Sequence, residues 1–147
     1  MAIAFSIAEL VIVIAVIGIM AALVVPCIQG QAMEAKEAAA KDNLRALRGA
    51  IELYAASHTG VAPGYVDNDP GGNADETCFL NQMIVAESYL RQMPVNPFNN
   101  LKSILMVDNG ASFQPTGDHG WLYQPATKTI RLDWRGRDRN NMPYVEY

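Results

Sequence analysis

The sequence predicts an α+β protein in which a long N-terminal α-helix, with a protruding apolar half, packs on a small antiparallel β-sheet. Charge is the first observation: 18% of the 147 residues are charged, yet residues 1–33 hold a single charged side chain, Glu9. An amphipathic helical pattern at 34–57 is the second. Three short strand-like segments after residue 102 are the third. The chain is therefore divided into an apolar rod and a polar head.

The apolar rod lies at the N-terminal end. Residues 10–25 are all apolar, and about 20 such residues cross a bilayer as a helix. A typical secretory signal peptide is not indicated, because residues 1–8 contain no Lys or Arg. We therefore divide the chain into a candidate leader remnant at 1–4, a transmembrane or filament-core helix at 5–33, and a globular head at 34–147.

Glu9 stands at the edge of this rod, where a carboxylate is costly to bury. Two interpretations stay open at this point. Glu9 either marks the water interface of a membrane anchor or pairs with a designated cation. A free α-amino group would supply that cation if the chain were cut before Phe5, because Glu9 would then be the fifth residue.

The order of residues 5–26 resembles the N-terminal signature of type IV pilins and type II secretion pseudopilins. In that family the mature chain begins with Phe, Glu is fifth and Pro is commonly twenty-second, and Phe5, Glu9 and Pro26 match those places. The resemblance implies a signal that a prepilin peptidase cuts before Phe5, with methylation of the new N-terminus. Ala4 stands where the family has Gly immediately before the cut.

Gly18 and Pro26 both fall inside the predicted helix, which runs from near residue 5 to near residue 58. Proline removes a backbone hydrogen bond and clashes with the preceding turn, so a kink or a locally melted turn is expected between 18 and 26. In the resembled family, melting here accompanies filament assembly. Glu9, Gly18 and Pro26 are therefore the candidate assembly residues.

The head is expected to begin with the C-terminal half of the helix, in which Leu44, Leu47, Ile51 and Tyr54 form one apolar stripe. Residues 60–77 are rich in Gly, Pro, Asn and Asp and are predicted to form a loop. Carboxylates in this loop fit either a calcium site or a solvated acidic loop, and the absence of EF-hand spacing favours the solvated loop. They belong to Asp67, Asp69, Asp75 and Glu76.

A short helix or two turns at 79–93, closed by Pro94 and Pro97, and a small antiparallel sheet complete the head. The run 89–98, a Tyr-Leu pair followed by two prolines and Phe98, resembles the major pseudopilin pattern more loosely. Strands are predicted at 103–107, 120–124 and 129–134, with a hairpin connection at 124–128. Alternation places Ile130, Leu132 and Trp134 on the face that packs against the helix stripe. The tail at 135–147 is predicted to be a surface segment whose basic side chains suit a neighbour's acidic loop.

Composition argues against several classes of function. A net charge of −4 disfavours nucleic-acid binding. Two cysteines, Cys27 and Cys78, are too few for a disulfide scaffold, although one bridge between them stays open. His58 and His119 are far apart, and no catalytic or metal-ligand spacing includes them, so no enzyme activity and no cofactor is expected.

We therefore expect a structural subunit that polymerises into a helical, type IV pilus-like extracellular filament through its apolar helix, because heterologous contacts that do not close propagate. The expected partners are copies of itself, the prepilin peptidase, the pilus or secretion assembly machinery, and the membrane before assembly. The expected location is the cytoplasmic (inner) membrane before assembly and an extracellular or periplasmic filament afterwards. The alternatives are a major pseudopilin of a type II secretion system and a membrane-anchored minor pilin that does not polymerise alone.

Overall fold

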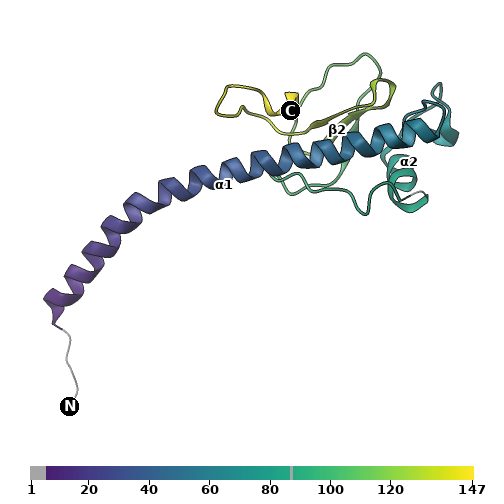
Figure 1. The fold of residues 1–147 in the computed structure, drawn as a ribbon. Coiled ribbons are helices and arrows are strands. Elements are labelled where there is room, and N and C mark those ends of the chain that lie inside the picture. Colours follow the sequence, from purple (N-terminus) through teal and green to yellow (C-terminus); the bar gives the residue numbers. More distant parts are fainter. Residues whose placement is uncertain (1–5, 87) are drawn as a thin grey trace. The chain divides into compact units, whose positions relative to one another are not determined.

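The computed structural model describes residues 6–86 and 88–147, with the side chains of 24–29 left undescribed. The chain divides into two compact units, Met1–Ala35 and Lys36–Tyr147, and each is described by itself. Helix α1, at Ile7–Ser57, runs through the first unit and into the second (Figure 1). The helical pattern of the sequence therefore gives one helix, as predicted.

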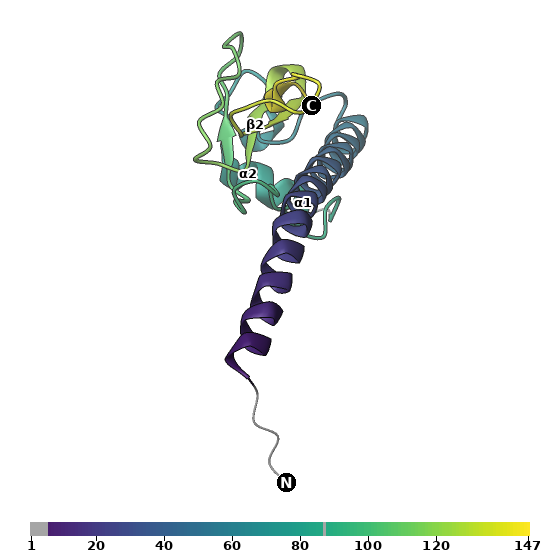
Figure 2. The same ribbon diagram turned by 90° about the vertical axis from the view of Figure 1, so that its left-hand side faces the viewer.

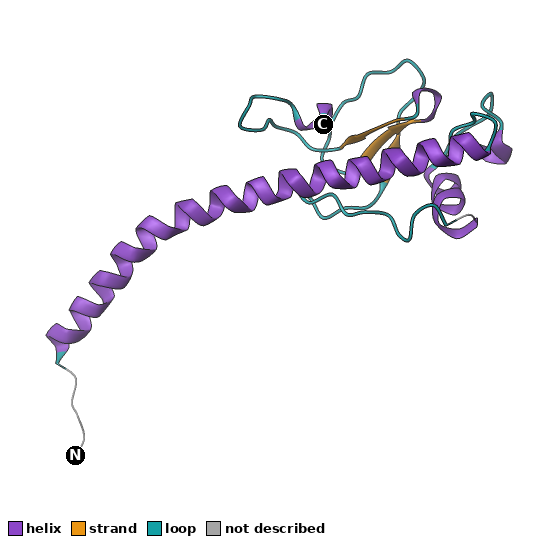
Figure 3. Cartoon of the chain, in the orientation of Figure 1, coloured by secondary structure: helices purple, strands orange, loops and turns teal. Residues whose placement is uncertain are grey.

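The second unit contains the remaining elements, all of them short (Figure 3). In chain order they are the 3₁₀-helix η1 (Val66–Asn68), helix α2 (Glu76–Leu80), the π-helix η2 (Asn81–Ala86), strand β1 (Ile104–Met106), strand β2 (Trp121–Gln124), the 3₁₀-helix η3 (Pro125–Thr127), strand β3 (Thr129–Leu132) and the 3₁₀-helix η4 (Tyr144–Glu146). This composition confirms the α+β class.

The sheet is mixed, and the prediction that it is wholly antiparallel is wrong. β2 and β3 are antiparallel and joined by residues 125–128, as the sequence predicted, with Trp121 opposite Leu132. β1, however, pairs with β2 in parallel, with Ile104 beside Trp121. A parallel pair needs a crossover of about a dozen residues, and the connection at 107–120 is long enough to carry the chain back to the start of β1.

The core of the second unit lies between α1 and the sheet, which Figure 2 shows side by side. The predicted helix stripe is confirmed, because Leu44, Leu47, Ile51 and Tyr54 are all buried in one cluster with the sheet. The sheet's contribution to that cluster consists of Ile104, Trp121, Tyr123, Ile130 and Leu132. Trp134 lies beyond the end of β3 and packs only partly against the cluster.

The second helical segment differs from its prediction at both ends. It begins at Glu76, because the Asp75 carboxylate accepts a hydrogen bond from the Cys78 N–H at 2.7 Å and caps the first turn. Its helical residues end at Ala86, and residues 89–93 are not helical. The prediction of 79–93 overlooked the Asp cap, and it extended the helix through apolar residues that pack without helical geometry.

The tail is not simply a surface segment, and that prediction is wrong at Tyr144. This side chain is buried in the core, and its hydroxyl donates to the Glu37 carboxylate at 2.9 Å. The Lys41 ammonium lies 4.2 Å from the centre of the Tyr147 ring. Arg48 donates a further hydrogen bond to the Tyr147 carbonyl. The tail therefore closes the fold by binding α1 near the start of the second unit.

Asp133 carries the most enclosed charge found among the described residues of the head. Its carboxylate is fully buried and accepts hydrogen bonds from the Gly117 and His119 N–H groups at 2.9 Å each. It also accepts bonds from the N–H and the hydroxyl of Thr116. Burial alone would raise the pKa of Asp133, but these bonds outweigh it and hold the pKa below its usual value. The carboxylate thereby fastens loop 116–119 to the end of β3.

Gly120 precedes β2 and allows the close approach of another backbone segment. A Cβ atom at this position would lie 2.5 Å from the Leu101 carbonyl oxygen. Gly120→Ala is therefore expected to lower the free energy of unfolding by about 1–3 kcal/mol, because backbone must shift to admit the methyl group. Chemical denaturation monitored by circular dichroism measures this change.

Gly49→Ala is the matched control for that substitution. Gly49 lies on the exposed side of α1, and a Cβ there meets nothing within 4 Å. The control is expected to raise stability by about 0.5–1 kcal/mol, since alanine favours the helix. Equal stability of the wild type and Gly120→Ala would contradict the close approach at residue 120.

Candidate functional site

The described N-terminal part of α1 presents apolar side chains to solvent at nearly every position. Exposed fractions range from 45% at Val13 to 82% at Ile7. The large exposed side chains in this segment are Ile7, Leu10, Val11, Ile12, Val13, Ile14, Val16, Ile17, Ile19, Met20 and Leu23. Soluble monomers rarely expose contiguous apolar surface of this extent, so the segment is the strongest candidate for an interaction site.

The exposed apolar surface surrounds the helix rather than following one stripe. Residues 10–14 are consecutive, and five consecutive positions cover more than a full turn of 3.6 residues. A helix that is apolar on all sides is stable when other apolar surfaces enclose it. Within the described residues, no helix combines the length and the hydropathy that crossing a membrane requires.

Glu9 lies in the first turn of α1 and is exposed. The Ser6 carbonyl accepts hydrogen bonds from the N–H groups of Glu9 and Leu10, both at 3.1 Å, which places Ser6 at the N-cap. Glu9 is then the third helical residue, and Ser-x-x-Glu is the capping-box pattern. The sequence interpretation missed this pattern, although it was readable from the spacing. A carboxylate here is also favoured by the helix dipole.

The structure describes Gly18 and the backbone of Pro26 but not the predicted processing residues. Gly18 is exposed, and a Cβ there would meet nothing within 4 Å, so no described contact requires glycine at this position. The helix is unbroken through Gly18 and Pro26, and the melted turn is therefore not seen in the isolated chain. Ala4 and Phe5, the predicted processing residues, lie outside the described residues.

The acidic side chains of the loop have structural partners. Asp69 accepts a hydrogen bond from the Gly71 N–H at 2.9 Å, and Glu76 accepts one from the Ile104 N–H at 2.8 Å. Asp75 caps α2, as described above. Among the residues that the structure describes, no group of three or more His, Cys, Asp or Glu side chains could hold a metal ion. Cys78 is a free thiol whose Sγ lies 3.2 Å from the Tyr65 carbonyl oxygen.

Comparison with known proteins gives one informative match. Over 101 residues, 65% of this chain and 68% of the relative, the sequence is 29% identical to the type II secretion system core protein G of Pseudomonas aeruginosa. The chain is a distant homologue of that secretion protein. No protein-family model matches the sequence, and no solved structure matches it.

This relationship confirms the resemblance that the order of residues 5–26 indicated. The similar protein is named as a core component of a secretion system, and this agrees with the expectation of a structural protein rather than an enzyme. The relationship also favours the pseudopilin alternative over the expected surface pilus, since the similar protein is named as a component of a secretion system. The observed fold, an exposed apolar helix followed by a head with a small sheet, agrees with this relationship.

Proposed function

We propose that this protein is a filament-forming pseudopilin of a type II secretion system. One observation carries the proposal: a helix apolar on all sides is exposed in a chain distantly homologous to a type II secretion core protein. Each fully buried Val, Leu or Ile side chain contributes about 1.5–3 kcal/mol relative to exposure. Enclosure of eleven large apolar side chains supplies a strong drive for association.

Two environments can enclose this helix, namely lipid and a bundle of identical helices. The apolar run of the sequence continues from the described positions through residues 24 and 25. We place the subunit in the inner membrane before assembly and in a periplasmic pseudopilus afterwards. Transfer between the two exchanges one apolar enclosure for another, so the helix need not enter water. Its partners are copies of itself and the secretion machinery.

Processing before Phe5 belongs to the same proposal. A prepilin peptidase would cut the Ala4–Phe5 bond and methylate the new amine, which would leave Glu9 as the fifth residue. The support is the spacing of Phe5, Glu9 and Pro26 in the sequence. Gly18 and Pro26 would then permit the helix to loosen locally when subunits enter the filament, because each weakens helical structure.

Electron microscopy and intact-mass spectrometry of the same material test the proposal. The chain is expressed together with the assembly components of a type II secretion system, and a strain without the prepilin peptidase is the control. We expect filaments in which this chain repeats along the whole length. The measured mass of the subunit should equal that of a chain that begins at Phe5 and carries one added methyl group. A subunit that stays monomeric in lipid, or occurs as a single copy at a filament tip, would contradict the proposal.

A further inference from the structure

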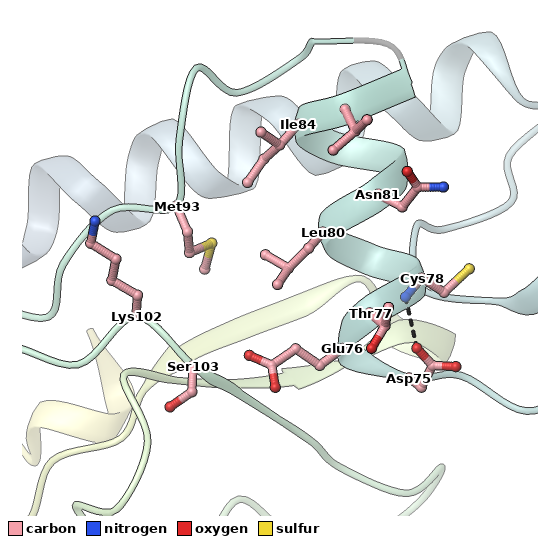
Figure 4. A pocket seen from close by; sticks show the side chains of 11 residues that line it. Asp75, Glu76, Thr77, Cys78, Leu80, Asn81, Ile84, Met93, Lys102 and Ser103 are labelled. Carbon is pink, nitrogen blue, oxygen red and sulfur yellow. Dashed lines mark hydrogen bonds between the residues drawn. The ribbon is translucent and has the colours of Figure 1, made fainter.

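An open apolar groove of about 950 Å³ lies on the head (Figure 4). One wall is formed by α2 and η2, and the other by the segments around Met93 and residues 102–103. The apolar lining consists of Leu80, Ile84, Val85 and Met93. Leu80 and Met93 point toward one another across the groove in Figure 4. Val85 is 73% exposed, whereas Met93 is buried, so the groove has an apolar floor and an apolar rim.

The charged residues that line the groove are two carboxylates and one lysine. Asp75 and Glu76 line one end, and Lys102 lies on the opposite side. One oxygen of Asp75 accepts from the Cys78 N–H, and one oxygen of Glu76 accepts from the Ile104 N–H, so both carboxylates are held in place. The exposed residues Asp67 and Asp69 extend the negative charge into the preceding loop.

A loop of complementary character lies in the tail, at residues 137–143. It includes Met142, a large apolar side chain that is 46% exposed and lies next to the Arg137–Pro143 bridge that closes the loop. Arg137 and Arg139 are exposed beside it, which gives the loop a basic surface around an apolar centre. The loop therefore matches the groove in both respects, an apolar side chain for an apolar floor and basic charges for an acidic rim.

This tail loop is held in one conformation by its own hydrogen bonds. The Asp138 carboxylate accepts bonds from the N–H groups of Asn140 and Met142, at 2.8 and 2.9 Å. The Asp138 N–H donates to the Met142 carbonyl at 2.9 Å, and Arg137 donates to the Asn141 carbonyl at 2.7 Å. Asp138 is thereby occupied within the loop. A loop ordered before binding loses less conformational entropy on docking.

The helical wall of the groove and the tail meet α1 at different places. The tail binds α1 through Glu37 and Lys41. The groove wall is joined to α1 near Tyr54, because Gln82 of η2 and the Tyr54 hydroxyl both donate to the Asn68 side chain. Glu37 and Tyr54 are separated by about 25 Å along a helix that rises 1.5 Å per residue. Groove and loop are two different patches of one chain, and a contact between unlike patches is heterologous, so it propagates instead of closing.

We propose that the Met142 loop of one copy docks in the Leu80–Met93 groove of a second copy. This contact deepens the proposed function and rests on it, since it supplies the head-to-head interaction between successive subunits. A second copy is the occupant that the observations favour, because one chain carries both surfaces. Its loop has two exposed arginines beside the exposed Met142, and its groove has an apolar floor with two carboxylates at one end. Met142 fills the groove, and Arg137 and Arg139 face the carboxylates of Asp75 and Glu76.

Cysteine crosslinking of the full-length chain tests the contact. Val85→Cys and Met142→Cys are combined in one chain in which Cys27 and Cys78 are replaced by serine, and assembled material is treated with a short bismaleimide. The matched control combines Met142→Cys with Leu53→Cys, since Leu53 of α1 is also exposed but does not line the groove. We expect a ladder of dimers and higher multimers at least about tenfold stronger than the control, joined between positions 85 and 142 in peptide mass spectra.

Filaments are counted separately by electron microscopy of the same samples. Filaments without a ladder above the control would overturn the groove contact and leave the filament function standing. A ladder without filaments would support the contact and reject the filament function. Crosslinks from position 85 to a different protein alone would also overturn the contact. As a second variant, Met142→Asp is expected to lower the filament count by about tenfold, because a carboxylate would enter an apolar groove beside Asp75 and Glu76. Met142→Leu should retain assembly at the wild-type level. Normal filaments with Met142→Asp would overturn the contact.

Discussion

Asp133→Asn is expected to lower the free energy of unfolding by about 2–4 kcal/mol. The carboxylate accepts four hydrogen bonds and donates none, and its side chain is fully buried. An asparagine of the same shape would point its side-chain NH₂ group, which can only donate, at an N–H or O–H group that now donates to the carboxylate. At least one buried N–H group of loop 116–119 would then lose its partner, which is the costly outcome for a polar group away from water.

Chemical denaturation of the wild type and Asp133→Asn at neutral pH measures this loss of stability. Asp118→Asn is the matched control. Asp118 lies in the same loop but is exposed, so its substitution should change stability by less than about 0.5 kcal/mol. Equal effects of the two substitutions would show that the buried hydrogen bonds of Asp133 do not stabilise the head.

The pKa of Asp133 also predicts how stability depends on pH. The pKa is lowered in the folded state, so this stabilisation is fully present above the usual carboxyl value of 3.8 and is lost as pH falls through the lower folded value. The difference in the free energy of unfolding between the wild type and Asp133→Asn should therefore become smaller below about pH 4. His119, whose Nδ1 lies 3.8 Å from the carboxylate, faces the same site. A constant difference from pH 7 to pH 2 would contradict the hydrogen-bonded, ionised carboxylate.

Glu9→Ala is expected to reduce filament formation by about tenfold or more while the subunit still reaches the membrane. In a bundle of apolar helices, a carboxylate is tolerated only where a cation meets it, and removal of one charge leaves the other buried without a partner. We propose that this requirement sets the axial register of each subunit against the amine of Phe5 in its neighbour. Sheared filaments and membrane fractions, quantified from the same cells, measure the two quantities.

Glu9→Gln separates this charge from the capping-box position of the same residue. Glutamine can still bond to the N-cap backbone, as the Ser-x-x-Gln pattern allows, but it carries no charge. Assembly should therefore fail in both Glu9 variants and persist in Glu52→Gln, which alters an exposed carboxylate of α1. Normal filaments with Glu9→Gln and none with Glu9→Ala would assign Glu9 to helix capping instead of register.

Local pattern was sufficient to predict that the helices and strands form and that β2 pairs with β3, but it did not predict the direction of β1 or the ends of the second helix. The helix stripe around Leu47 and the alternation of Ile130 and Leu132 were readable, because burial on one face imposes a fixed period. The parallel pairing of Ile104 with Trp121 was not readable, since it depends on the path of a connection that carries no periodic signal. The end of the second helix was missed for a similar reason, because apolar residues near Leu90 pack on the core without helical geometry.

The candidate assembly site was predicted from the sequence to the extent that it is a local feature. Glu9 is the single charge of an otherwise apolar segment, and its place in the first turn of α1 follows from the nearby Ser6 cap. The Leu80–Met93 groove could not be predicted from the sequence, because its residues come from three separate segments that only folding brings together. The sequence predicted only the opposite charges of this groove and the Met142 loop, from the acidic residues of the loop at 60–77 and the basic residues of the tail.

By itself, the sequence determined that this protein has an apolar rod, a polar head and a relationship to pilin-like proteins, because hydropathy and residue order are properties of neighbouring positions. Only the tertiary structure decided that β1 runs parallel to β2, that Tyr144 enters the core and that Asp133 is buried among four donors. Each of these depends on contacts between residues distant in the chain. Such contacts are selected by the free energy of packing the whole head, which no single segment encodes.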